Sequence, residues 1–277
     1  DGPIASKPGE RTAMDWWSAP CTGLLGSTGF FAPIDICSGN YYVYPCASKS
    51  ESAVVLDLYH RDAAHDGVTI LPGSVTYTDN EGIFTGHKFN AKLSELGSVH
   101  EHSAEYEPWG NGAAESINRT LPNMMRAAHI QGGADDVFWE LSAVDCASLL
   151  CTITERDGKS LYERWCGKRK SIAGRKTLFC YALAVKPVPW RGGKIDAQQV
   201  EGVYCGKARR KQGFYVWTPE YGIVTSTNVT FIEDRFPFKE GLKYTPHPSP
   251  SHHTSGLRIL NGGATLATPP TEDTTID

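Results

Sequence analysis

The sequence contains no long hydrophobic run. Its longest unbroken apolar stretch, residues 178–185, has 8 residues in a chain of 277. A membrane-spanning helix needs about 20 apolar residues, so no membrane partner is expected. The first ten residues, DGPIASKPGE, contain neither the apolar core of a signal peptide nor an initiator Met. We interpret the chain as a piece cut from a longer one.

The eight cysteines include no C-x-x-C pair. They are Cys21, Cys37, Cys46, Cys146, Cys151, Cys166, Cys180 and Cys205. In a chain of this length without a signal peptide, we interpret them as reduced intracellular thiols rather than disulfides. The sequons at Asn118 and Asn228 then carry no glycan. His60 and His65 have no partnering C-x-x-C, so a structural zinc site is not expected, and no local motif favours a Cys–His nucleophile.

Charge of either sign is modest overall but unevenly distributed. The formal net charge is -4, which argues against a protein that simply coats DNA. Residues 1–150 carry a net charge of about −11 and residues 151–220 about +9. An acidic part followed by a basic part suggests carboxylate chemistry in the first and contact with a polyanion in the second; a basic linker or a solvated face is the alternative.

The first part of the chain has the pattern of an α/β protein with a mixed sheet. The apolar and aromatic runs at 30–36 and 41–44 predict a hairpin. Ser48 and Glu51 form a capping-box pattern at the start of an amphipathic helix that ends near Gly67. Further periodicity predicts strand material at 68–78, a helix ending at Gly97, a strand at 98–102, and helices from about 112 and over 135–152.

The pattern changes to short strands after residue 178. Strands are expected at 178–186, 203–205, 213–218, 222–225 and 228–232, which is typical of a small all-β module. The predicted domains are a catalytic core at 10–155, a basic linker at 156–177, the β module at 178–235 and a flexible Pro/Ser/Thr-rich tail at 236–277.

Three acidic residues fall at the ends of predicted elements in the α/β part. Asp15 lies in RTAMDWW, Asp79 follows a strand in VTYTDN, and Glu115 lies in the first turn of a helix after the loop EPWGNG. Mg²⁺ prefers such hard carboxylate oxygens, and two Mg²⁺ ions about 3.5–4 Å apart suit attack on a phosphodiester. Because the chain has 31 acidic residues, spacing alone is weak support.

Several blocks in the same order give the sequence a resemblance to a known family. TDNEG resembles TDNG, and EYEPWGNGAAESINRTL resembles YTPQQNGVAERxNRTL, with 35 residues between Asp79 and Glu115 as in that family. PIDICSGNYYVYP, DVFWELSAVDCASLL, SLYERWCGKRK and VEGVYCGKARRKQGFYVWTPEYG follow in the family's order. Over roughly residues 8–235 the chain resembles the integrase segment of a Copia-type retrotransposon Pol polyprotein.

The resemblance implies an RNase H-like core followed by an SH3-like β module, and a DNA strand-transfer enzyme. It assigns two Mg²⁺ or Mn²⁺ ions to Asp15, Asp79 and Glu115. Asp35 competes with Asp15 by proximity but matches a non-catalytic hairpin block. The implied partners are double-stranded DNA, as element ends and as target, further copies of the chain, and other parts of the polyprotein. The implied location is intracellular, in the nucleus during integration.

Residues expected to contact DNA lie outside the acidic triplet. They are Asn111, Arg119, Lys168, Arg169, Lys170, Arg209 and Arg210. A solvated basic surface is the alternative interpretation.

Three departures from the family pattern favour an alternative, a catalytically inactive remnant that only binds nucleic acid. Glu81 replaces Gly after TDN, Trp109 and Gly110 replace Gln-Gln, and Pro122 falls inside the helix that carries Glu115. A Pro in a helix interior costs about 3 kcal/mol, so disruption of the far end of that helix is expected. A generic RNase H-type nuclease is the third hypothesis.

Overall fold

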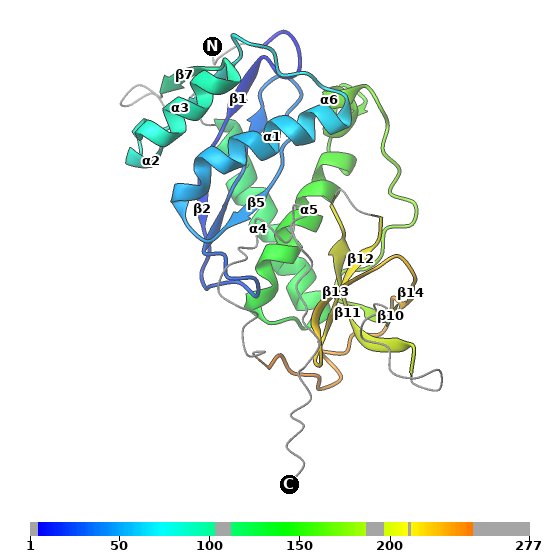
Figure 1. The fold of residues 1–277 in the computed structure, drawn as a ribbon. Helices are drawn as coiled ribbons and strands as arrows, with labels where there is room; N and C mark the ends of the chain where they lie inside the picture. The colour runs from blue at the N-terminus through cyan, green and yellow to red at the C-terminus, as the bar shows by residue number, and fades with distance from the viewer. Residues whose placement is uncertain (1–4, 103–111, 187–196, 210–211, 246–277) are drawn as a thin grey trace.

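The computed structural model describes residues 5–102, 112–186, 197–209 and 212–245 (Figure 1). In this part of the chain, no helix is both long and apolar enough to cross a bilayer.

A four-stranded mixed sheet and a three-stranded antiparallel sheet form the first part of the chain, and two interrupted strands run through both. The first strand runs as β1 (Arg11–Ala13) and β2 (Trp16–Ser18), and the second as β3 (Gly29–Phe31) and β4 (Ile34–Asp35). These two pair antiparallel, and β3 pairs antiparallel with β5 (Tyr44–Cys46). On the other side of β1 lie β6 (Val75–Thr78) and then β7 (Val99–His102), both parallel to β1. The expected mixed α/β core is confirmed.

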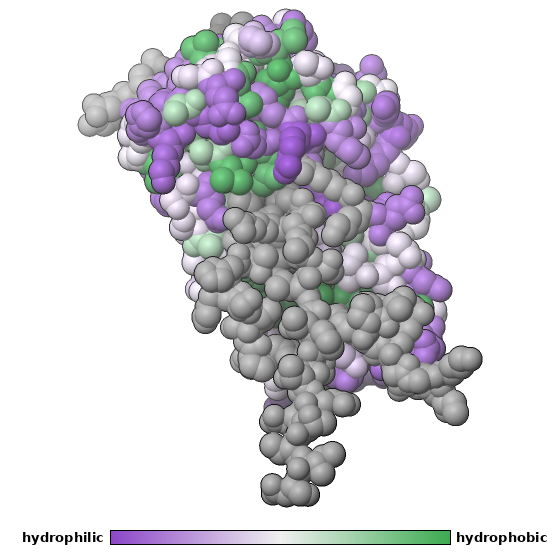
Figure 2. All heavy atoms as spheres, viewed as in Figure 1, coloured by the Kyte–Doolittle hydropathy of each residue, from purple (hydrophilic) through white to green (hydrophobic). Residues whose placement is uncertain are grey.

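Helices cover both faces of these sheets. Neighbouring residues of a strand point to opposite faces, so each face carries its own apolar side chains. Phe31 and Tyr44 pack against α1 (Ser52–Asp66), α2 (Gly82–Thr85) and α3 (His87–Leu96). Phe30 and Val43, one residue earlier in each strand, pack against α4 (Gly112–Gly132) and α5 (Trp139–Ile153). Figure 2 shows the outer surface around α1 and α3 as mainly hydrophilic with small hydrophobic patches.

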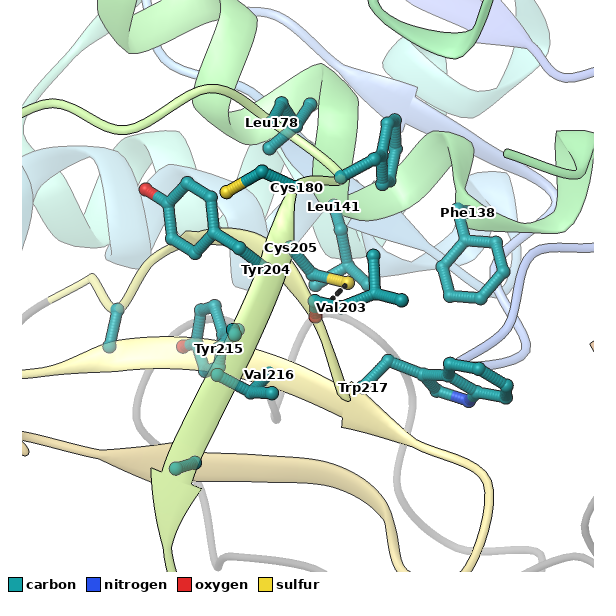
Figure 3. Close-up of a cluster of buried hydrophobic side chains, with 14 of the residues drawn as sticks. Phe138, Leu141, Leu178, Cys180, Val203, Tyr204, Cys205, Tyr215, Val216 and Trp217 are labelled. Atoms are coloured by element: carbon teal, nitrogen blue, oxygen red, sulfur yellow. Dashed lines mark hydrogen bonds between the residues drawn. The ribbon is translucent and has the colours of Figure 1, made fainter. Parts of the chain in front are cut away.

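The predicted all-β module is confirmed, and it packs against the core. It is an antiparallel sheet in the order β13-β12-β11-β10-β14. Its strands are β10 (Tyr181–Val185), β11 (Gln199–Lys207), β12 (Phe214–Thr218), β13 (Gly222–Ser226) and β14 (Val229–Ile232). Phe138 and Leu141, at the start of α5, are buried in one cluster with Val203, Tyr204 and Trp217 (Figure 3). The core and the β module therefore share apolar packing.

The segments expected to be a linker and a tail are partly folded against these cores. Residues 156–177 include α6 (Leu161–Cys166), whose Trp165 is buried against Tyr59 at a ring separation of 6.2 Å. Beyond 235, Phe238 lies 5.2 Å from the ring of Phe138. Aromatic burial therefore moves the described fold past both expected boundaries. Residues 246–277 of the expected tail lie outside the described residues.

Two local expectations from the sequence are wrong. Pro122 does not disrupt the far end of α4, which continues to Gly132 because Leu121 and Met125 on either side of it are buried in the core. Before α1, the carboxylate of Glu51 accepts from the backbone N–H of Ala47 at 2.7 Å, and the side chain of Ser48 caps no backbone N–H. A 3₁₀ turn at Lys49–Glu51 therefore replaces the predicted capping box.

A buried carboxylate of α5 holds the loop between β2 and β3. The backbone N–H of Leu25 donates to Glu140 Oε2 at 2.5 Å, and that of Ser27 donates to Oε1 at 2.9 Å. Glu140 has no exposed surface, and burial raises its pKa to about 7 despite these hydrogen bonds. The folded protein therefore binds this proton more tightly than the unfolded chain does.

We expect Glu140 to make the stability fall as the pH rises. Between about pH 4.5 and pH 7 the folded state holds more protons than the unfolded state, so the free energy of unfolding decreases by roughly 3 kcal/mol from this residue and then levels off. Urea denaturation at pH 5, 6, 7 and 8 should show a steeper decrease in the unmodified protein than in Glu140→Gln. Glu155→Gln, at an exposed site, is the control. Equal slopes in all three proteins would contradict the prediction.

Arg209 joins the β module to the core. Its guanidinium lies over the rings of Tyr42 and Tyr44 at 5.1 and 4.9 Å from the centroids, and it donates to the carbonyl of Val43 at 3.2 Å. Asp62 of α1, whose side chain is 5% exposed, lies 3.8 Å from the same guanidinium. A buried cation with aromatic and carboxylate partners is costly to remove, because its removal leaves Asp62 without this positive charge.

Substitution of Arg209 should therefore destabilise the protein more than loss of an exposed cation. We expect Arg209→Met to lower the free energy of unfolding by roughly 2–4 kcal/mol. The exposed Lys207 two residues earlier provides the control, and Lys207→Met should change stability by less than about 0.5 kcal/mol. Chemical denaturation at one pH measures both. Similar losses in the two variants would show that Arg209 does not join the two parts energetically.

Candidate functional site

The pairing of β1 with β6 brings the first two predicted carboxylates together. In this parallel pair Ala13 is opposite Tyr77, and the backbone N–H of Met14 continues the ladder by donating to the carbonyl of Tyr77 at 2.9 Å. Asp15 lies two residues after Ala13, and Asp79 lies two residues after Tyr77. Both side chains therefore leave the same face of the sheet, at neighbouring positions.

Asp15 is held by hydrogen bonds to both of its carboxylate oxygens. It lies in the interruption between β1 and β2, where the backbone N–H of Trp16 donates to Oδ1 at 2.7 Å. The side-chain amide of Asn118 in α4 donates to Oδ2 at 2.8 Å. The second bond joins residues 103 positions apart, so it docks α4 against the first strand beside the site.

Asp79 begins a tight turn after β6. The backbone N–H of Glu81 donates to Asp79 Oδ1 at 3.1 Å, and the hydroxyl of Thr78 lies 3.0 Å from the backbone carbonyl of Asp79. The carboxylate of Glu81 is paired with Lys49, which precedes α1. The negative charge that distinguishes TDNEG from the family pattern therefore has a cation beside it.

The pKa values of Asp15 and Asp79 are both raised, with burial as the largest cause. Burial raises the pKa of Asp15, the bonds from Trp16 and Asn118 lower it, and the charges of Asp79 and Glu81 raise it again. Burial also raises the pKa of Asp79, while the Glu81 N–H, Lys49 and His102 lower it. A bound cation would stabilise the ionised form of Asp15, which the negative charges of Asp79 and Glu81 disfavour.

Glu115 lies in the first turn of α4, but its side chain lies outside the described residues. Position 118 is three residues further along the helix, so positions 115 and 118 share one face. Asn118 contacts Asp15 from that face. The face of α4 that carries positions 115 and 118 is therefore turned toward Asp15. The role of Glu115 stays a prediction.

Asp35, the alternative to Asp15 as a metal ligand, makes hydrogen bonds that hold the local fold. Its side chain is fully buried and accepts from the backbone N–H of Gly9 at 2.8 Å and from the N–H and hydroxyl of Ser38 at 2.7 and 2.6 Å. These donors tie the hairpin turn to the N-terminal segment. The assignment of Asp35 to a non-catalytic hairpin fits this arrangement.

The five predicted DNA contacts whose side chains are described do not lie together at one place. Arg119 is exposed on α4, next to Asn118. Lys168, Arg169 and Lys170 lie in the loop after α6, on the opposite side of the ribbon from α2 and β7 (Figure 1).

Lys170 and Arg209 have partners within the chain. Lys170 lies over the ring of Tyr162 at 4.8 Å, and Arg209 is engaged by the core as described above. Asn111 and Arg210 lie outside the described residues. DNA contact by these residues stays a prediction.

Two residues of the site were not selected from the sequence. Asn118 was noted only as a sequon, although it lies in the ESINRTL block that carries the resemblance. No local sequence pattern identifies Lys49 as part of the site, because its partner Glu81 is 32 residues away in sequence.

The residues present suit a divalent cation in part. Asp15 and Asp79 supply hard oxygen donors on rigid elements, which is what Mg²⁺ or Mn²⁺ requires. Among the residues whose side chains are described, no group of three or more acidic, His or Cys residues forms a complete site. Glu115 is the third ligand that the resemblance implies, and this role stays a prediction.

The sequence is similar to part of a retrotransposon polyprotein. No family model matches the chain. Over 215 residues it is 27% identical to the retrovirus-related Pol polyprotein from transposon TNT 1-94 of Nicotiana tabacum. The match covers 75% of this chain and 16% of that polyprotein. The resemblance to the integrase segment of a retrotransposon Pol polyprotein is confirmed.

Similar solved structures are integrases. The catalytic core of BIV integrase has a TM-score of 0.44 and 20% identity, covering 57% of this chain and 93% of that one. The HTLV-2 integrase core in complex with magnesium has a TM-score of 0.45 and 13% identity, covering 58% and 99%. A simian T-cell lymphotropic virus intasome in complex with the PP2A subunit B56 gamma has a TM-score of 0.49 and 14% identity, covering 85% and 80%.

We expect Asn118 to influence the ionisation of Asp15. Its amide donates to the ionised carboxylate, so Asn118→Leu should raise the pKa of Asp15 further above its ordinary value. Carboxyl-carbon NMR titration measures this, with an expected increase of about one unit at most. Asn123→Leu, further along the same helix, is the control. A pKa of Asp15 that is the same in all three proteins would remove Asn118 from the site.

Proposed function

We propose that this chain catalyses DNA integration by trimming a DNA 3′ end and joining the freed 3′-hydroxyl to a target phosphodiester. One observation carries the proposal, namely that the β1–β6 pairing sets Asp15 beside Asp79 while Asn118 docks α4, the helix of Glu115, against them. The 27% identity to a retrotransposon polyprotein supports the same function.

Asp15, Asp79 and Glu115 would hold two Mg²⁺ or Mn²⁺ ions. Such ions supply charge neutralisation at the transferring phosphoryl group and an activated water or hydroxyl nucleophile. The chain keeps its carboxylates oriented through the N–H groups of Trp16 and Glu81 and the amide of Asn118. Because neither step needs a covalent enzyme intermediate, no Ser or Tyr nucleophile is required.

The proposed substrates are double-stranded element ends and target DNA. Lys168 and Arg169 are exposed cations, which suit phosphate contacts. We further propose that the chain acts as a homo-oligomer, that it is initially joined to other parts of a Copia-type Pol polyprotein, and that it works in the nucleus during integration. The chain spans about a sixth of the curated polyprotein it matches, so activities of the whole polyprotein stay proposals.

A second candidate is an inactive remnant that only binds nucleic acid. Glu81 favours it, because its carboxylate raises the pKa of both Asp15 and Asp79 and so opposes their ionisation. The pairing of Glu81 with Lys49 acts in the other direction. Catalysis therefore has to be measured.

Joining of short duplex ends into plasmid DNA in the presence of Mg²⁺ or Mn²⁺ tests the proposal. Asp79→Asn and Glu115→Gln should each reduce joining by more than about a hundredfold while leaving DNA binding nearly unchanged, since they remove metal-ligand charge rather than the DNA-binding surface. Asp57→Asn is the matched control, because Asp57 is a partly exposed acid on α1 that is paired with Lys92 of α3.

The outcomes separate the candidates. Joining that persists in Asp79→Asn would overturn the site assignment. DNA binding without joining in the unmodified protein, across a panel of duplex ends, would favour the remnant. Cleavage of an RNA–DNA hybrid offered in parallel, without joining, would indicate a generic RNase H-type nuclease.

A further inference from the structure

Behind the carboxylate pair, on the other face of the sheet, lies a row of hydrogen-bonded side chains. Thr78 precedes Asp79, so its side chain points away from the carboxylates and toward α3. On the neighbouring strand, His100 lies opposite Thr76 in the parallel register, which places it on the same face as Thr78. Phe89 of α3 packs edge-on against the His100 ring at 5.3 Å.

The orientation of His100 is fixed from α3. The side-chain Nδ2 of Asn90 donates to the carbonyls of Phe84 and Gly86 at 3.1 and 3.2 Å. With both donors of the amide used in this way, Oδ1 of Asn90 faces His100 Nδ1 at 2.8 Å as an acceptor. Nδ1 of His100 therefore carries a hydrogen and donates it to Asn90.

The other ring nitrogen faces the site. Nε2 of His100 lies 3.0 Å from the hydroxyl of Thr78, which is fully buried. Burial and the neighbouring His102 lower the pKa of His100 to about 4, so the ring is neutral near pH 7 and Nε2 is an acceptor. The single proton of the Thr78 hydroxyl is therefore shared between two acceptors, Nε2 of His100 and the backbone carbonyl of Asp79.

We propose that His100 and Thr78 are positioning residues that hold the backbone turn of Asp79 from behind and so aim its carboxylate. The turn has one anchor on each side, the Thr78 hydroxyl at the Asp79 carbonyl and the Glu81 N–H at Asp79 Oδ1. A shift of the Asp79–Asn80 peptide moves both. His100 sets where the Thr78 hydroxyl lies, and Asn90 sets the His100 ring. That this matters for metal binding rests on the proposed function.

Amide exchange of Glu81, measured by NMR without metal, tests the geometry directly. Thr78→Val keeps the branched shape and removes the hydroxyl; His100→Phe keeps the ring against Phe89 and removes the acceptor. Thr78→Val should accelerate exchange of the Glu81 amide by roughly three- to tenfold, the effect of losing about one hydrogen bond. His100→Phe keeps the Thr78 hydroxyl but removes the contact that fixes its position, so it should accelerate exchange by a smaller factor. Thr76→Val is the matched control, because Thr76 is a buried threonine on the same face of β6.

Conservative replacements separate positioning from general packing. Thr78→Ser restores the hydroxyl and His100→Gln offers an acceptor to it, so both should exchange at rates close to the unmodified protein. If Thr78→Val and His100→Phe leave Glu81 exchange unchanged, or if Thr76→Val accelerates it equally, the proposal is overturned.

Mn²⁺ titration monitored by calorimetry links the turn to the site. Thr78→Val and His100→Phe should weaken Mn²⁺ binding about tenfold, as substitutions behind metal ligands usually do, while Thr76→Val should not. Unchanged Mn²⁺ affinity in both variants would overturn the positioning role. If the unmodified protein binds no Mn²⁺, the proposed function fails instead, and the exchange rates alone decide whether His100 and Thr78 hold the turn.

Discussion

The parallel pairing of the first strand with β6 is the constraint on which the rest of the site depends. It places two residues that are 64 positions apart at adjacent points of one sheet, with both carboxylates on the same face. Everything else acts on that pair. Asn118 brings α4 to Asp15, the Glu81 amide holds Asp79, and the row from Asn90 through His100 to Thr78 supports the turn from the opposite face.

The same strand alternation that separates the two carboxylates from Thr78 divides the core. One layer of aromatic and aliphatic side chains lies under α1 and α3 and another under α4 and α5. Since α5 also contributes Phe138 and Leu141 to the β module, the module is fixed to the core by shared burial. Arg209, between Tyr42 and Tyr44, adds a second attachment. The orientation of the β module is thus determined by packing.

Buried acids in this protein have two different uses. Glu140 and Asp35 are fully buried and hold loops by accepting backbone N–H groups, whereas Asp15 and Asp79 are partly exposed and the charge of Asp79 raises the pKa of Asp15. Buried carboxylates are costly in either use, and hydrogen bonds offset that cost for the structural ones. For Asp15 and Asp79, a bound divalent cation would offset the remaining cost of holding their negative charges close together.

The sequence by itself determined the kind of fold, most element positions and the candidate carboxylates. Periodicity, glycine stops and the TDN and ESINRTL blocks report on local conformation and family resemblance, and both are readable within short windows. Only the tertiary structure decided that Asp35 is buried under hairpin donors, that Asn118 reaches Asp15, that Arg209 faces the core, and that Pro122 is tolerated. Each of those outcomes depends on contacts between residues far apart in the chain. Burial and long-range pairing set their energies, and no local pattern encodes which distant residue will be the partner.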